Sequence, residues 1–170
     1  RQRQMCIRDR CLFNVPGRSG VNMEAATVAA LSHDCPNIIA VKEASGRFDQ
    51  ATAILKSKRA DFAALSGEDA LLLPLMSLGF EGVISVIANV LPNDYACLVK
   101  SALQGDYPTA RRIHLDRAEL CKALFEEGNP AGIKAALHAA GIIRQNTLRL
   151  PLTPVSDALY NKIIGLLKLH

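Results

Sequence analysis

Short apolar runs alternate with helical patterns over the first half of the chain, and this alternation constrains the fold most. Four runs predict strands, at 11–15, 38–42, 62–65 and 82–86. Helical patterns separate them, at about 22–33, 48–57 and 68–78. Strands that recur with a helix between each pair are typical of βαβ units, so the sequence predicts an α/β fold with a parallel sheet.

Two side chains predict local features of these helices. Asn22 precedes the first helical pattern, and its side-chain oxygen could accept a hydrogen bond from a free backbone N–H, so we expect it to be the N-cap. Pro74 lies too deep in 68–78 for the first turn of that helix, and proline cannot donate a backbone hydrogen bond. We therefore expect a kink or irregular backbone there.

Polar side chains lie near or directly after the C-terminal end of every predicted strand. They are Asn14 and Arg18, Lys42 and Glu43, Ser66 and Glu68, and Ser85 and Asn89. In a (β/α)8 barrel the C-terminal ends of the strands form the active-site face, and a doubly wound sheet also binds its ligand there. No GxGxxG follows a strand and no GxxxxGK[ST] occurs, so the two phosphate-binding loops of doubly wound folds are not indicated.

The segment IIAVKEASG, residues 38–46, places a lysine at the end of an apolar strand. Burial disfavours an ammonium group, and a neutral amine is a nucleophile towards carbonyl carbons. Lys42 is therefore a candidate for Schiff-base chemistry. The alternative is a lysine that extends its ammonium group from the strand end into solvent.

Composition and charge exclude several classes of protein. The chain has 49% hydrophobic and 21% charged residues, which is typical of a globular domain, and no apolar run approaches the roughly 20 residues that a membrane-spanning helix needs. Residues 1–10 carry four arginines and one aspartate, which account for +3 of the net charge of +4. The remainder has no basic stripe with interleaved aromatic residues, so a nucleic-acid-binding role is rejected.

Residues 1–10 resemble a non-native leader, because they show neither strand nor helix periodicity and no apolar segment follows them as in a signal peptide. The five cysteines are scattered and never spaced as CxxC, which predicts reduced thiols in a cytosolic protein. The four histidines form no HExxH pair, so no metal site is predicted.

After Asn89 the strand patterns stop. Helical patterns follow at about 92–104, 107–126 and 131–140, and a last helix carries Leu159, Ile163 and Leu166. A full (β/α)8 barrel takes about 250 residues and eight strands. Four strands in residues 11–91 therefore predict half of such a barrel, and residues 92–170 predict a helical module.

Six segments carry a resemblance to a known family. They are FNVPGRSG at 13–20, IIAVKEASG at 38–46, ALSGEDA at 64–70, EGVISVIAN at 81–89, EEGNPAGIKAAL at 126–137 and TLRLPLTP at 147–154. In this order they resemble the later strands and the helical tail of the dihydrodipicolinate synthase family. These are pyruvate-dependent class I aldolases related to N-acetylneuraminate lyase. The resemblance implies the C-terminal half of a (β/α)8 barrel and a fragment of a cytoplasmic, homo-oligomeric enzyme, a tetramer or a dimer.

The resemblance also implies roles for named residues. Lys42 would form an imine with pyruvate and then an enamine that attacks aspartate semialdehyde, a step of lysine and diaminopimelate biosynthesis. Arg18 would hold the carboxylate of that second substrate, and Gly67 and Ile84 would line the pyruvate pocket. No cofactor is implied beyond the covalent imine.

Two departures bear on activity. Phe13 stands where the family has a tyrosine whose hydroxyl relays protons, and acid–base groups of this kind typically contribute about 10²- to 10⁴-fold. The family's early strands, which complete the site, have no counterpart, so we expect the chain expressed alone to be inactive and to associate. Two alternatives stay open: a pyruvate aldolase of the N-acetylneuraminate lyase type, against which Arg18 stands, and a non-catalytic paralogue, which Phe13 favours.

Overall fold

The structure is a computed structural model, and it describes residues 8–167. The chain divides into two compact units, Arg1–Ile84 and Ser85–His170, whereas the sequence predicts a boundary between residues 91 and 92. Residues 1–7 of the predicted leader lie outside the described residues. Arg10, the last residue of that leader, begins the first strand and pairs with Ile38.

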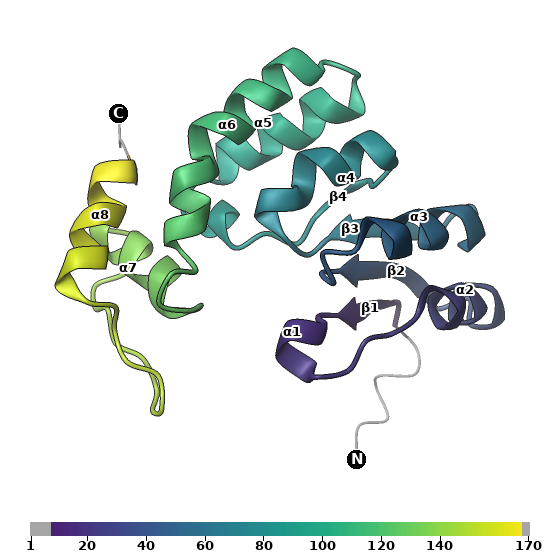
Figure 1. The fold of residues 1–170 in the computed structure, drawn as a ribbon, viewed down its shortest axis with the longest axis horizontal. Coiled ribbons are helices and arrows are strands. Elements are labelled where there is room, and N and C mark those ends of the chain that lie inside the picture. The colour runs from purple at the N-terminus through teal and green to yellow at the C-terminus, as the bar shows by residue number, and fades with distance from the viewer. Residues whose placement is uncertain (1–7, 168–170) are drawn as a thin grey trace. The chain divides into compact units, whose positions relative to one another are not determined.

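The first unit is a four-stranded parallel sheet in the order β1-β2-β3-β4, with a helix between successive strands (Figure 1). The strands are β1 (Arg10–Asn14), β2 (Ile38–Glu43), β3 (Ala63–Ser66) and β4 (Gly82–Val83). The helices are α1 (Pro16–Ser19), α2 (Ala25–Asp34), α3 (Phe48–Ser57) and α4 (Leu72–Leu78). The predicted parallel α/β arrangement is therefore confirmed.

The two faces of this sheet differ in burial because side chains alternate along each strand. Val41 and Ala64 point to the helical side, where they are fully buried with Val28, Ile54 and Phe62 in one hydrophobic core. On the other face the side chain of Phe13 is 63% exposed, and Lys42 is half-buried. Helices α2, α3 and α4 thus cover one face, and the opposite face carries the predicted lysine.

Three local predictions for this unit were inaccurate. The first long helix begins at Ala25, and Asn22 is not its N-cap, because the side chain of Asn22 is hydrogen-bonded to other side chains instead. The predicted strand 82–86 is only two residues long. The helix predicted at 68–78 is a 3-10 turn, η2 (Asp69–Leu71), followed by α4. This break places Pro74 in the first turn of α4, where its missing N–H needs no partner. The irregular backbone therefore lies before the proline, at Asp69–Leu71, and not at Pro74.

The second unit is helical, as predicted. After a 3-10 turn, η3 (Ile87–Asn89), it contains α5 (Pro92–Leu103), α6 (Tyr107–Ala123), α7 (Ala131–Ala139) and α8 (Asp157–Leu167). Each long helix buries one face, with Leu98 on α5, Leu120 on α6 and Ile163 on α8 at 1% exposure or less. Arg117 of α6 also pairs with Asp94 of α5 at 2.6 Å between Nε and Oδ2.

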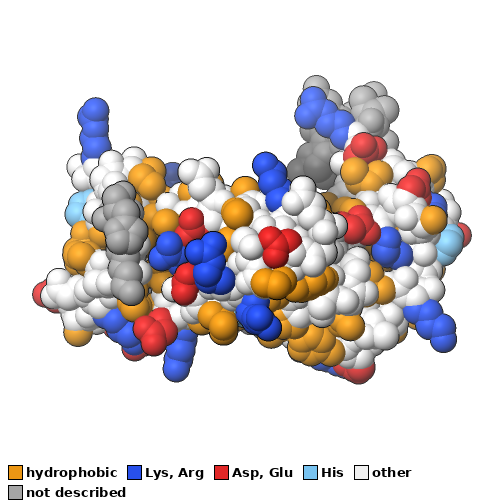
Figure 2. Space-filling view, turned by 90° about the horizontal axis from the view of Figure 1, so that it is seen from above, with side chains coloured by type: hydrophobic (Ala, Val, Ile, Leu, Met, Phe, Trp, Pro, Cys, Tyr) orange, Lys and Arg blue, Asp and Glu red, His pale blue; other side chains and the backbone are white. Residues whose placement is uncertain are grey.

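The surface shows no single dominant charge in the view of Figure 2, where basic and acidic side chains are interspersed with hydrophobic ones. This mixture agrees with the small net charge outside residues 1–10. Within residues 8–167, no helix is both long enough and apolar enough to span a membrane.

Candidate active site

Lys42 lies near the C-terminal end of β2, on the face of the sheet opposite the helices. Its register partners are Phe13 on β1 and Leu65 on β3. The Nζ atom of Lys42 lies 4.5 Å from the centroid of the Phe13 ring, within the range of a cation–π contact. The pairing of parallel strands thus places residue 13 directly beside the candidate nucleophile.

Gly67 follows β3 and lies against the side chain of Lys42. A Cβ atom at residue 67 would lie 2.9 Å from Cε of Lys42 and 2.5 Å from Cβ of Ala44, both closer than carbon atoms pack. The N–H of Gly67 also donates to the carbonyl oxygen of Glu43 at 2.8 Å. Glycine is therefore required for the close approach of this loop to the lysine.

The other two predicted site residues lie at the same end of the sheet. Arg18 is exposed and sits in α1, directly after β1. Ile84 follows β4, its N–H donates to the carbonyl of Ser66 at 2.9 Å, and its side chain is 41% exposed. The structure thus brings Phe13 and Gly67 each against Lys42. It places Arg18 in α1 after β1 and Ile84 directly after β4.

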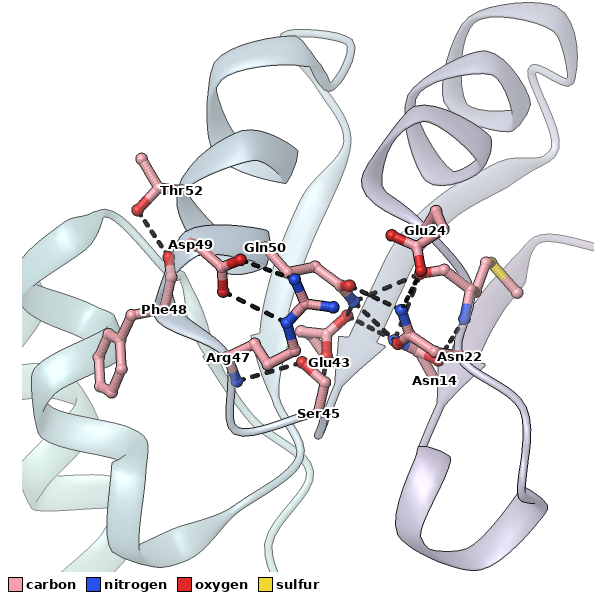
Figure 3. Close-up of polar contacts among 11 residues, drawn as sticks. Asn14, Asn22, Glu24, Glu43, Ser45, Arg47, Phe48, Asp49, Gln50 and Thr52 are labelled. Carbon is pink, nitrogen blue, oxygen red and sulfur yellow. Dashed lines mark hydrogen bonds and ion pairs between the residues drawn. The ribbon is translucent and has the colours of Figure 1, made fainter.

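A buried polar cluster lies on the helical side of the sheet, next to Lys42 in the sequence (Figure 3 shows its hydrogen bonds). Its centre is the carboxylate of Glu43, which is 3% exposed. Oε2 of Glu43 accepts hydrogen bonds from Nδ2 of Asn14 at 2.8 Å and from Nε2 of Gln50 at 3.0 Å, and Oε1 accepts from the N–H of Ser45 at 2.7 Å. Asn22 completes the cluster by bonding both Asn14 and Gln50.

A small hollow lies beside the loop that follows β2. It is lined by residues 43–48, Ala51, Glu68, Leu71 and Leu75. Burial, together with the negative charge of Glu43, raises the pKa of the Glu68 carboxyl group above its ordinary value. The hollow is thus a place where a second negative charge is unfavourable.

Comparison with known proteins decides the family. Residues 8–169 match the model of the dihydrodipicolinate synthetase family. The chain belongs to this family. It is 51% identical over 152 residues to the 4-hydroxy-tetrahydrodipicolinate synthase of Azobacteroides pseudotrichonymphae, and 49% identical over 157 residues to that of Parabacteroides distasonis. These alignments cover 89% and 92% of this chain but 51% and 52% of the relatives, so the chain spans about half the length of the curated relatives that it matches.

Solved structures of the dihydrodipicolinate synthetase family show the same fold. The dihydrodipicolinate synthase of Aquifex aeolicus matches with a TM-score of 0.90 at 39% identity, and that of Thermotoga maritima with 0.91 at 37%. Each match covers 94% of this chain and 54% or 55% of the solved chain. These relatives are (β/α)8 barrels, so the predicted fold class, half of such a barrel with a helical extension, is confirmed.

The part of this family member that the structure describes contains no group of three histidine, cysteine, aspartate or glutamate side chains placed to hold a metal ion. The polar cluster around Glu43 was missed by sequence reasoning as a unit. Its only signal was that Asn14 and Glu43 both lie at the C-terminal ends of predicted strands. Gln50 carried no signal of its own, and Asn22 was predicted to be an N-cap instead.

Glu68→Gln is expected to raise the midpoint of thermal unfolding at pH 7. The raised pKa means that the native state binds the Glu68 proton more tightly than the unfolded chain does, so the free energy of unfolding falls as pH rises through this range. Glutamine removes that cost. At pH 3, below the ordinary glutamate pKa of about 4.3, both states are protonated and the two proteins should unfold alike.

Glu81→Gln is the matched control for this measurement. Glu81 pairs with Lys58 at 3.1 Å, so its loss removes an attraction and should give no gain at pH 7. A gain for Glu68→Gln that is equal at both pH values would show that packing, and not charge, sets the effect.

Proposed function

We propose that this chain forms the lysine-bearing part of a synthase that condenses pyruvate with aspartate semialdehyde. The observation that carries the proposal is the side chain of Lys42 at the strand end, packed against Gly67 and beside residue 13. Relatives that are 51% and 49% identical in sequence and are named 4-hydroxy-tetrahydrodipicolinate synthase support this proposal. The homo-oligomeric state and the cytoplasmic location stay predictions.

The proposed reaction begins at Nζ of Lys42. Its lone pair attacks the keto carbon of pyruvate, the keto oxygen leaves as water, and an imine joins the two. Loss of a proton from the pyruvate methyl group gives an enamine, whose carbon attacks the aldehyde of aspartate semialdehyde. Because Gly67 has no side chain, the stem of Lys42 can lie flat against the loop and hold Nζ at the strand end.

Borohydride trapping tests this proposal. A full-length protein that carries these residues should form a stable adduct with pyruvate, and peptide mapping should place it on Lys42. Lys134 is a useful internal reference, because it lies on α7 and donates to the carbonyl of Thr147. An adduct on Lys134, or on no lysine at all, would contradict the proposed function.

Arg18→Ala is expected to weaken the use of aspartate semialdehyde far more than that of pyruvate. A guanidinium fork suits a carboxylate, and a hydrogen bond to a charged group is worth about 1.5–3 kcal/mol, or about ten- to a hundred-fold in affinity. Steady-state kinetics with each substrate varied in turn compares the loss for aspartate semialdehyde with the loss for pyruvate. Arg47→Ala, an exposed arginine paired with Asp49, serves as control. Equal losses for both substrates would indicate an ordinary loop arginine.

A non-catalytic paralogue is the second candidate, and Phe13 favours it. The phenyl ring stands beside Lys42 without a hydroxyl group that could move a proton. Such a protein would still form the imine with pyruvate but would not turn over aspartate semialdehyde. The trapping experiment and a turnover assay on the same preparation therefore separate the two candidates.

A further inference from the structure

We propose that the buried carboxylate of Glu43, clamped by Asn14 from the neighbouring strand, positions Lys42 for imine formation. The proposal rests on the proposed function, because positioning matters only if Lys42 is the nucleophile. Glu43 directly follows Lys42 in β2, and by strand alternation its side chain points to the opposite face of the sheet. It therefore acts through the lysine and does not reach the substrate.

The burial of Glu43 shows that the cluster is built for something beyond packing. A carboxylate that is 3% exposed is costly to bury unless its oxygens are hydrogen-bonded, and both oxygens of Glu43 are (Figure 3). The next residues along the same face of the sheet, Val41 and its register partner Ala64, are apolar. Well-packed apolar side chains commonly stabilise a core as well as a buried polar cluster does. We therefore assign the cluster to fixing one geometry.

The geometry that it fixes is the register of β1 against β2. Asn14 pairs with Glu43 in the ladder, and the adjacent pair is Phe13 with Lys42. A slip of one residue would turn every side chain of β1 to the other face and remove residue 13 from the lysine. The 2.8 Å bond between Asn14 and Glu43 forms only in the observed register.

Neighbouring segments form hydrogen bonds to both members of the Asn14–Glu43 pair. The N–H of Met23, just before α2, donates to Oδ1 of Asn14 at 2.9 Å. Gln50 of α3 donates to Glu43 and accepts from Asn22 at 2.8 Å. The N–H of Ser45 bonds the Glu43 carboxylate and so fixes the turn that follows the lysine. The residue and the turn that directly follow Lys42 are thereby held in place.

Glu43→Gln in a full-length protein that carries these residues tests the proposal. Glutamine keeps the shape, but its amide NH2 must face either the Ser45 N–H or the two amide donors of Asn14 and Gln50. We expect the rate of borohydride-trapped imine formation at saturating pyruvate to fall about 10- to 100-fold, the loss typical of small misplacements. The pyruvate concentration that gives half the maximal rate should stay unchanged.

Glu24→Gln is the matched control, because Glu24 is exposed and its carboxylate accepts a hydrogen bond from Asn22 at 2.9 Å, and none of the hydrogen bonds drawn in Figure 3 joins it to Glu43 or Asn14. It should trap pyruvate at the wild-type rate. A folded Glu43→Gln protein with a wild-type rate, or an equal loss in Glu24→Gln, would overturn the positioning role. So would a loss confined to the half-saturating pyruvate concentration.

Gln50→Met covers the case in which Glu43→Gln does not fold. It removes one donor to Glu43 and leaves the Asn14 contact in place, so trapping should slow by a smaller factor, about threefold to tenfold. An unchanged rate in folded Gln50→Met would also overturn the proposal. If the wild-type protein itself gives no adduct on Lys42, the proposed function fails. That result is distinct from a change, or lack of change, in the trapping rate of the variants.

Discussion

Phe13→Tyr is expected to raise the turnover of pyruvate with aspartate semialdehyde about 10²- to 10⁴-fold in a full-length protein that carries these residues. The centroid of the Phe13 ring lies 4.5 Å from Nζ of Lys42, so a para hydroxyl group would stand near the amine. A hydroxyl there can deliver and remove protons as the imine forms, which a phenyl ring cannot do. The measurement is a coupled assay of steady-state turnover.

Phe48→Tyr is the control for added polarity. Phe48 begins α3 and is 42% exposed, so it accepts a hydroxyl equally well without standing beside Lys42 in the register of the strands. It should leave turnover unchanged. If Phe13→Tyr brings no gain while borohydride still traps pyruvate on Lys42, the non-catalytic paralogue is the better assignment.

The alternation of strands and helices could be read from the sequence because each element carries its own pattern. The helix at Phe48–Ser57 has the predicted bounds, and β2 begins at Ile38 as predicted. The strand at 82–86 was overextended, because pairing with β3 ends where Ser66 meets Val83. An apolar run shows that residues are to be buried, but only a partner strand makes them a strand.

The position of the lysine could also be read from the sequence, whereas its surroundings could be read only in part. Parallel strands bring their C-terminal ends to one edge, which is why Lys42 and Gly67 meet. The Glu43 cluster joins four segments through side chains, and no local pattern encodes such pairings. Asn22 is an example. Its residue type and position before a helical pattern are typical of an N-cap, but its side chain is hydrogen-bonded to Asn14 and Gln50, which are distant in the sequence.

Gly67→Ala is expected to slow imine formation about 100-fold, the cost typical of displacing a reacting group by about 1 Å. The added methyl group would lie 2.5 Å from Cβ of Ala44 and 2.9 Å from Cε of Lys42. The Ala44 methyl group has no rotamer to change, so the backbone must shift to relieve that contact, whereas the contact with Lys42 can be relieved by the lysine stem. The stem is the flexible partner, and its movement carries Nζ away from the strand end. Borohydride trapping at saturating pyruvate measures the loss.

Gly82→Ala separates this effect from a general intolerance of side chains at the sheet edge. Gly82 is buried in β4, but a Cβ atom there would lie 3.5 Å from Cδ2 of Leu65, an ordinary van der Waals contact. Overpacking at Gly67 should cost about 1–3 kcal/mol of unfolding free energy, and Gly82→Ala should cost less. Because Lys42 would be displaced only by the first variant, Gly82→Ala should trap pyruvate at the wild-type rate. Equal trapping by Gly67→Ala would mean that the loop yields instead of the lysine, and that the close approach does not fix Nζ.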